Sequence, residues 1–280
     1  MTRTARALTI ASSDSGGGAG IQADLRAFAA AGCHGASVIV ALTAQNTREV
    51  TAIHAVPTDF ITAQVDAVFD DIGADAVKTG MLLSAEIIEV VAVSLAGRVV
   101  PLVVDPVMIA SSGARLLRED AVEVMVRALF PLATVVTPNL PEAELITGAR
   151  GTRRELAERL CEMGAAAVIV TGGHGEDPVD HLCDGRDHLE IPVPRHAVAA
   201  THGAGCTHSA TLAALLAQGW PLAQAARTAA EVASAAVARG LDDIGAGEGP
   251  VDVLDVRSRL RVPVVSGGVL PTPFREGRPA

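Results

Sequence analysis

One continuous stretch near the N-terminus decides the fold class: Ala7-Leu8-Thr9-Ile10-Ala11, then Ser12-Ser13-Asp14-Ser15-Gly16-Gly17-Gly18-Ala19-Gly20, then residues 21–31. The first run is short and apolar, which is typical of a buried strand, and residues 21–31 place apolar side chains at helical spacing. A buried strand that enters a helix through a glycine-rich loop is typical of a β-α unit in a parallel sheet. The stretch therefore predicts an α/β fold.

The same alternation of short apolar runs and longer helical patterns continues along most of the chain. Residues 182–191 are predicted to form a β-hairpin with Asp184-Gly185 at its turn. We expect one α/β domain over residues 1–256, with a parallel sheet and crossover helices, and a loosely ordered tail over residues 257–280. The predicted strands are 7–11, 36–42, 74–78, 99–104, 134–137 and 166–170, and the predicted helices are 21–31, 58–71, 85–95, 119–129, 153–163, 207–218 and 221–239.

Composition limits the classes of partner. The 280 residues are 49% hydrophobic and carry a net charge of −10, which opposes binding to nucleic acid or to an anionic membrane. ATP is not opposed, because a local cradle of backbone N–H groups needs no net positive charge. The four cysteines have no C-x-x-C pair and no zinc spacing, and no apolar run reaches the roughly 18 residues of a membrane span. We expect a cytoplasmic protein that binds a small molecule.

Polar or glycine-rich segments follow nearly every predicted strand. The carboxyl ends of parallel strands meet at one edge of the sheet, where α/β proteins bind their ligands. We therefore expect these segments to converge on one site. They are residues 12–20, 43–47, 79–81, 105–108, 138–142 and 172–174.

The glycine loop after the first strand does not match known nucleotide motifs. Residue 21 is Ile, so the G-x-G-x-x-G spacing fails, and no Gly-Lys-Ser/Thr ending follows. The loop is interpreted as one that lets the backbone approach a ligand, with a flexible turn as the alternative. Asp24, one turn into the next helix, is by itself typical of a solvated acid in a first turn.

A second glycine turn, Gly203-Ala204-Gly205-Cys206, runs directly into an apolar helical segment. A helix start presents unpaired N–H groups and the positive end of its dipole, which favours an anion such as phosphate. A cysteine at that point is easily biased toward thiolate. The turn indicates phosphoryl transfer; the alternative is tight helix packing with Cys206 as a small buried hydrophobe.

Three oxygen-bearing side chains stand at strand ends: Asp105, Asn139 and Glu142. Such oxygens hold Mg²⁺ directly or through water, although Glu142 could simply cap a helix beside Pro141. Gln45 follows the second strand, and its amide offers a donor and an acceptor that suit a heteroaromatic ring, with an Asn-containing turn as the alternative. His174 and the other histidines, among them His202 and His208, have no metal spacing, so we treat most of them as structural.

Read together, these segments resemble the ribokinase-like superfamily and, within it, the hydroxymethylpyrimidine/phosphomethylpyrimidine kinases of thiamine biosynthesis. The resemblance runs from about residue 8 to residue 254. The motifs that carry it are residues 14–25, 44–47, 78–82, 104–108, 137–143, 172–174 and 201–207.

The resemblance implies a central, mostly parallel sheet flanked by helices on both faces, and a homodimer. It also implies an ATP- and Mg²⁺-dependent kinase that phosphorylates 4-amino-5-hydroxymethyl-2-methylpyrimidine and then its monophosphate, with Cys206 as base. The implied site residues are Gly203, Gly205 and Cys206 for catalysis, Ala204, Asn139 and Gly173 for the nucleotide, Asp105 and Glu142 for Mg²⁺, and Gln45, Asp24, Met81 and Val107 for the substrate.

Two departures from the family keep alternatives open. Thr171 stands where family members commonly have Lys, and Ala204 replaces the usual Thr. The Gly-Ala-Gly-Cys form is familiar from related pyridoxal kinases, so a pyridoxal kinase of the same fold is one alternative. The other is a weakened paralogue that binds a pyrimidine or a nucleotide without turnover.

Overall fold

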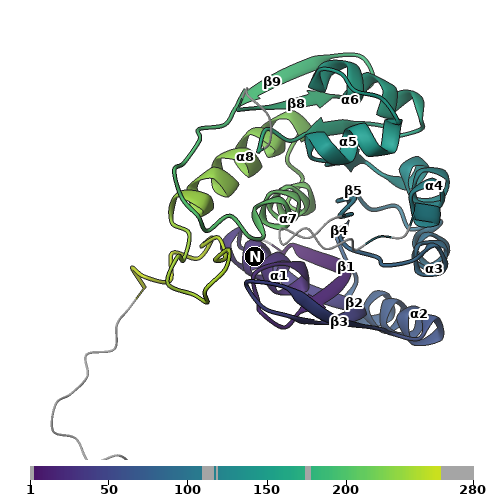
Figure 1. The fold of residues 1–280 in the computed structure, drawn as a ribbon. Helices are drawn as coiled ribbons and strands as arrows, with labels where there is room; N and C mark the ends of the chain where they lie inside the picture. Colours follow the sequence, from purple (N-terminus) through teal and green to yellow (C-terminus); the bar gives the residue numbers. More distant parts are fainter. Residues whose placement is uncertain (1–2, 109–116, 118, 174–177, 260–280) are drawn as a thin grey trace, which may run out of the picture.

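The computed structural model describes residues 3–108, 117, 119–173 and 178–259, and it places their strands in one sheet (Figure 1). The strand order is β3-β2-β1-β4-β5-β6-β7-β8-β9. The bounds are β1 Arg6–Asp14, β2 His34–Gln45, β3 Val50–Ala55, β4 Ala76–Thr79, β5 Leu102–Val104, β6 Val135–Val136, β7 Val168–Val170, β8 Val179–Cys183 and β9 His188–Pro192.

The inner strands are parallel and the edges are antiparallel. Ile10 of β1 pairs with Val38 of β2 on one side and with Thr79 of β4 on the other, both in parallel. β3 pairs antiparallel with β2, and β8 and β9 form the expected hairpin. The prediction of a mostly parallel sheet is confirmed. β3 was not predicted. Most of its residues are exposed, so its sequence lacks the alternation of apolar and polar side chains that indicates a half-buried strand.

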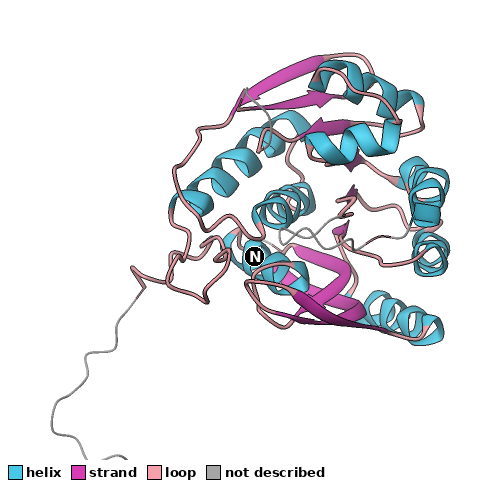
Figure 2. Cartoon of the chain, viewed as in Figure 1, coloured by secondary structure: helices cyan, strands magenta, loops and turns pink. Residues whose placement is uncertain are grey.

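Helices cover both faces of the sheet (Figures 1 and 2). Ile10 belongs to the same buried cluster as Ile61 of α2 and Ile88 of α3, whereas Ala7 belongs to the cluster of Phe28 in α1. Alternate residues of a strand point to opposite faces, so one strand supplies both cores. The helices are α1 Gly20–Ala30, α2 Thr58–Ala67, α3 Ala85–Leu95, α4 Glu119–Ala128, α5 Leu140–Thr147, α6 Arg153–Glu162, α7 Ala204–Ala217 and α8 Leu222–Ala238.

Three helical segments differ from the expected bounds. The helix predicted over residues 58–71 is α-helical only to Ala67 and continues as a π-helix, η1, over Val68–Ile72. Elsewhere, a 3-10 turn, η2 (Phe130–Leu132), follows α4. The start of α5 was expected as the loop after a strand, with a helix capped by Glu142 as the alternative; the alternative holds, because Asn139 and Glu142 form a complete capping box there. α7 begins at Ala204, three residues before the predicted start, so the glycine turn itself forms its first turn.

The strand order places a ligand crevice at a definite point. From β1 the chain passes to β2 on one side and later returns to β4 on the other side of β1. In open α/β sheets ligands bind beyond the carboxyl ends of the strands at such a reversal. The loops after β1 and β4 should therefore open into the site.

Two expectations about the ends and the surface remain. The predicted tail, residues 257–280, lies outside the described residues from residue 260 onward, and the single domain over residues 1–256 stays a prediction. Among the described residues, no helix is both long enough and apolar enough to cross a membrane.

Candidate active site

A cavity of about 740 Å³ opens beyond the carboxyl ends of the strands, on the side where α7 begins. The polar segments predicted to converge do so here, since the carboxyl end of β2 and the segments that follow β1, β4, β5, β6 and β7 all contribute to its lining. All but one of the predicted site residues line it: Gln45, Met81, Asp105, Val107, Asn139, Glu142, Gly173, Gly203, Ala204, Gly205 and Cys206. His174 lies outside the described residues.

The glycine turn before α7 has the geometry of an anion cradle. Gly203 is the N-cap of α7 with φ of 83°, a left-handed conformation that glycine adopts without strain. A Cβ at Gly203 would collide with the backbone oxygen of Gly18. The turn packs against the loop after β1 and lines the cavity; the Ala204 N–H donates to the Thr201 carbonyl at 3.1 Å, so the N–H groups of α7 that can serve an anion begin at Gly205.

The glycine loop after β1 is held by Asp14. The Asp14 carboxylate accepts hydrogen bonds from the backbone N–H groups of Gly16 (2.7 Å), Gly18 (3.0 Å) and Ala19 (2.9 Å). A Cβ at Gly18 would overlap the imidazole of His202. Glycine is thus needed at residue 18 for packing between two loops, and the expected approach of this loop to a ligand stays a prediction. Ala19 and Gly20 are the parts of this loop that line the cavity near α1.

Asp24 is the exception among the predicted site residues. Its side chain is fully buried and does not line the cavity, so both the expected substrate contact and the solvated first-turn acid are wrong. The carboxylate accepts from Thr9 Oγ1 (2.6 Å) and lies 3.0 Å from Lys78 Nζ. Asp24 reaches the site only through Lys78, which does line the cavity.

Lys78 is a buried cation that was not among the predicted site residues. Its Nζ lies 3.5 Å from Asp105 Oδ2 as well as beside Asp24. Burial opposes its charge, but the carboxylates of Asp24 and Asp105 outweigh burial and raise the pKa of Lys78. The available signal was a lysine in a strand otherwise built of apolar residues and threonine.

Cys206 differs from expectation in its protonation. Burial raises the pKa of the Cys206 thiol to about 12, although Lys78 acts in the opposite direction. Asp105 and Asp24 add repulsion against a thiolate. The pKa of Cys206 is thus shifted in the direction opposite to the expected bias toward thiolate.

Asp105 and Glu142 form a pair of carboxylates at the ends of β5 and β6. Asp105 Oδ2 is buried and makes no hydrogen bond within the described residues. Glu142 accepts from the N–H groups of Asn139 (2.9 Å) and Met108 (3.3 Å), so it caps α5 as the alternative interpretation held. Burial and the charge of Asp105 raise the pKa of Glu142 to about 8.

These two carboxylates fit a divalent cation that takes most of its ligands from water and from phosphate oxygens. Within the described ranges, no group of three or more His, Cys, Asp and Glu side chains is placed to hold a metal ion. Asp105 Oδ2 is paired with Lys78 Nζ at 3.5 Å but accepts no hydrogen bond within the described residues, so it can still take a metal ion or a metal-bound water. Mg²⁺ usually keeps waters and phosphate oxygens beside one or two carboxylates.

The substrate end and the nucleotide end of the cavity are built differently. Met81 packs with Val107, Val50 and Leu83 beside Gln45, which gives an apolar wall next to an amide. At the other end, Asp180 of β8 accepts from the N–H of Gly172 and lies 3.3 Å from His208 Nε2. Asp180 was not predicted as a site residue. The feature that could have indicated it is an acidic side chain within a strand, β8.

A family model described as phosphomethylpyrimidine kinase matches residues 14–252. The chain belongs to the phosphomethylpyrimidine kinase family. The hydroxymethylpyrimidine/phosphomethylpyrimidine kinase of Rhizobium meliloti (strain 1021) is 50% identical over 256 residues, covering 89% of this chain and 96% of the relative. The thiamine biosynthesis bifunctional protein ThiED of Geobacter sulfurreducens is 49% identical over 263 residues, covering 90% of this chain. The match spans about half of that longer relative, 54%.

Solved structures agree with this family and its ribokinase-like fold. The phosphomethylpyrimidine kinase of Clostridium difficile 630 has a TM-score of 0.75 at 39% identity, and it is covered over 100% of its chain and 84% of this one. An ADP complex of Bacillus subtilis pyridoxal kinase has a TM-score of 0.83 at 35% identity, with 100% of that chain and 91% of this one covered. The fold predicted from the sequence is confirmed.

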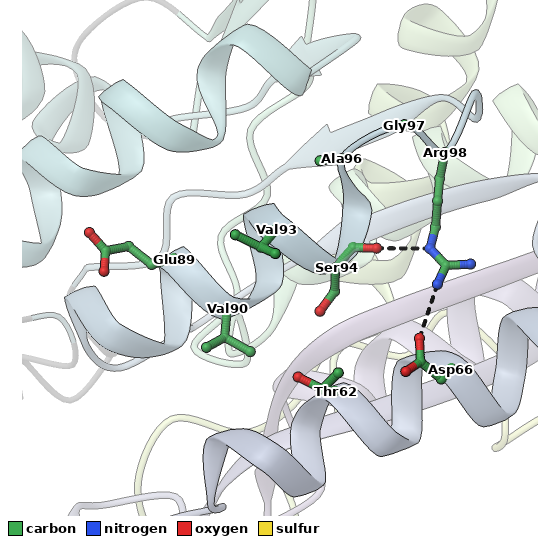
Figure 3. Close-up of a pocket in the computed structure, with 9 residues that line it drawn as sticks. All are labelled: Thr62, Asp66, Glu89, Val90, Val93, Ser94, Ala96, Gly97 and Arg98. Carbon is green, nitrogen blue, oxygen red and sulfur yellow. Dashed lines mark hydrogen bonds and ion pairs between the residues drawn. The ribbon is translucent and has the colours of Figure 1, made fainter.

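A second hollow, of about 540 Å³, lies between α2 and α3, away from the kinase cavity (Figure 3). Its cation, Arg98, already donates to Asp66 (3.1 Å) and to the carbonyl of Ser94 (2.8 Å). The guanidinium also lies 3.9 Å from the centre of the Phe69 ring. None of the predicted site residues lines this hollow.

Proposed function

We propose that this chain transfers a phosphoryl group from ATP to the hydroxymethyl group of 4-amino-5-hydroxymethyl-2-methylpyrimidine, and then a second one to the resulting monophosphate. The observation that carries the proposal is that the amide of Gln45 and the N-terminus of α7, with Cys206, line one cavity. An amide that reads a ring and a helix start that holds phosphate are the two parts that such a transfer requires. Membership of the kinase family supports the reaction type.

The nucleotide is assigned to the α7 end. Gly203 and Gly205 would cradle the transferring phosphoryl group with backbone N–H groups, and Ala204, Asn139 and Gly173 would contact ATP on the same side. Asp105 and Glu142 would hold Mg²⁺, which when bound offsets the charge on the phosphate oxygens. The buried Asp105 Oδ2, which accepts no hydrogen bond within the described residues and is paired only loosely with Lys78 at 3.5 Å, supports this assignment.

Cys206 is assigned as the base for the alcohol. A primary alcohol is a poor nucleophile, so a positioned base that takes its proton speeds the first transfer. The thiol must lose its own proton first, and the positive charge of Lys78 beneath α7 favours the thiolate. Asp24 has a positioning role, since it holds Lys78 in place.

The ring is assigned to the Gln45 end, with Met81 and Val107 against its faces. A pyridoxal kinase is the second candidate, favoured by Ala204 and by the TM-score of 0.83 to the Bacillus subtilis pyridoxal kinase. Gln45 favours the aminopyrimidine instead, because pyridoxal has no amino group beside its ring nitrogen. A protein that binds without turnover is the third candidate, since Thr171 puts a hydroxyl in the cavity where the family often has a cation.

A homodimer and a cytoplasmic location complete the proposal. The homodimer rests on the family resemblance. The location rests on cysteine usage and on the bacterial relatives. Sedimentation of the purified chain tests the first of these.

One assay separates the three candidates. The purified chain is given ATP and Mg²⁺ with the pyrimidine alcohol, its monophosphate or pyridoxal, and each product is resolved by chromatography. We expect kcat/KM for the pyrimidine alcohol to exceed that for pyridoxal by roughly tenfold or more. A preference for pyridoxal would establish the second candidate. Tight pyrimidine binding without product would establish the third.

A further inference from the structure

His202 sits at the junction of the substrate end and the phosphate end of the cavity. Its Nε2 lies 3.1 Å from Asp14 Oδ2 and 3.4 Å from Nε2 of Gln45. The side chains of His202 and Asp14 are 10% and 4% exposed, and all three residues line the cavity. The next residue, Gly203, begins the anion turn. A single imidazole therefore touches the anchor of one loop and the ring-reading amide of another.

The protonation of His202 at Nε2 follows from Asp14. Burial would raise the pKa of Asp14, but hydrogen bonds from His202 and from the backbone of Ala19 and Gly16 outweigh it and hold that pKa below its usual value. An ionised carboxylate can only accept hydrogen bonds. The Nε2 atom of His202 must therefore carry a hydrogen and donate it to Asp14, whichever form the other ring nitrogen takes.

The orientation of the Gln45 amide follows in turn. An amide NH₂ group at 3.4 Å from an Nε2–H would place two donors face to face, whereas the amide oxygen can accept a share of that hydrogen. Turning the amide puts its NH₂ group beside Thr43 Oγ1, which lies 3.1 Å from the other amide atom. Thr43 can accept there, because its own hydroxyl donates to the carbonyl of Ser13 at 3.1 Å.

We propose that His202, held by Asp14, is a specificity-determining positioning residue that fixes the Gln45 amide with its oxygen toward the imidazole. One N–H and one oxygen lone pair of the amide then remain for a ligand, in a fixed order. That order suits a ring-nitrogen acceptor next to an amino donor, which an aminopyrimidine has and pyridoxal lacks. The inference rests on the proposed function, and it adds the residue that makes Gln45 selective.

The test compares two ligands and two variants by calorimetry on the full chain. The ligands are 4-amino-5-hydroxymethyl-2-methylpyrimidine and its analogue with hydrogen in place of the amino group. His202→Leu removes the ring donor, and His202→Gln returns an N–H that can reach Asp14. In the wild type, we expect the amino compound to bind roughly tenfold more tightly than the analogue. We expect His202→Leu to abolish this preference and His202→Gln to restore most of it.

A matched control and ADP separate specificity from folding. His196 also lines the cavity but bonds to Ser234 Oγ (2.9 Å), so His196→Leu should keep the preference for the amino compound. All variants should bind ADP as the wild type does. If His202→Leu no longer binds ADP, His202→Gln alone decides the question.

Three results would overturn the inference. These are a preference that persists in His202→Leu, a preference lost equally in His196→Leu, and a preference missing from a His202→Gln protein that still binds ADP. A wild-type protein that binds both pyrimidines equally would overturn the proposed substrate and the inference with it.

Discussion

The Nζ atom of Lys78 lies 3.0 and 3.1 Å from the two carboxylate oxygens of Asp24, and both side chains are completely buried. Thr9 donates to the same carboxylate, and Asp105 lies on the other side of the ammonium. Buried charges persist only when they are paired and hydrogen-bonded. The pair therefore fixes the Lys78 ammonium beneath the start of α7, where Cys206 has to lose a proton.

Breaking this pair should cost far more stability than breaking an ion pair on the surface. Lys78→Met leaves two buried carboxylates without a cation, and we expect it to lower the free energy of unfolding by about 3–5 kcal/mol. The control is Arg127→Ala, which removes an exposed pair with Glu89 at 3.1 Å and should cost under about 1 kcal/mol. Chemical denaturation measures both, and similar losses would contradict the buried pairing.

Removing the Cys206 thiol should separate the two phosphorylation steps. Cys206→Ala lacks the base for the alcohol, so we expect the turnover of the first step to fall by roughly 100-fold or more. The monophosphate is already an anion near neutral pH, so its phosphorylation should fall by less than about tenfold. Separate assays of the two substrates measure this.

Cys161 supplies the control for that experiment, because it lies outside the cavity and Cys161→Ala should change neither rate. Equal losses in the two steps of Cys206→Ala would remove Cys206 from the role of base.

Glu142 should make stability depend on pH. Its pKa is raised from 4.5 to about 8, so the folded chain keeps a proton that the unfolded chain loses. The contribution of Glu142 to the free energy of unfolding is complete below about pH 4.5. It is lost as the pH rises toward 8, and the free energy of unfolding falls by about 1.4 kcal/mol per pH unit in this range.

Denaturation series between pH 5 and pH 8 measure this slope, compared with Glu142→Gln, which keeps an oxygen for capping and has no charge to titrate. A slope that persists unchanged in the variant would assign it to other groups. Added Mg²⁺ should flatten the wild-type slope, because a cation favours the ionised carboxylates.

Gly203 should tolerate no side chain, and the reason is packing as well as φ. Gly203→Ala would place a methyl group against the backbone oxygen of Gly18, whereas Gly97 has a similar φ of 80° with open space around it. We expect Gly97→Ala to cost about 1 kcal/mol from backbone strain alone. Gly203→Ala should cost clearly more and weaken ADP binding by roughly tenfold or more. Equal costs would mean that the two loops do not interlock.

Much of this fold could be predicted from the sequence, because its signals are local. Apolar runs such as residues 7–11 and helical spacing such as residues 21–31 depend on neighbours a few positions apart. The missed elements lacked such signals: β3 has no buried face, and α5 begins at Leu140 within a motif that was interpreted as a loop, with a helix cap at Glu142 as the alternative.

The sequence by itself determined the alternating architecture and the order of the strand-end motifs, and since parallel strands share one edge, that order was enough to predict where they converge. Tertiary structure decided what each group does there. Asp24 became the buried partner of Lys78, 54 residues away, and His202 met Asp14 across 188 residues. Charge, burial and hydrogen-bond direction depend on such distant neighbours, because desolvation and pairing exist only once the chain has folded.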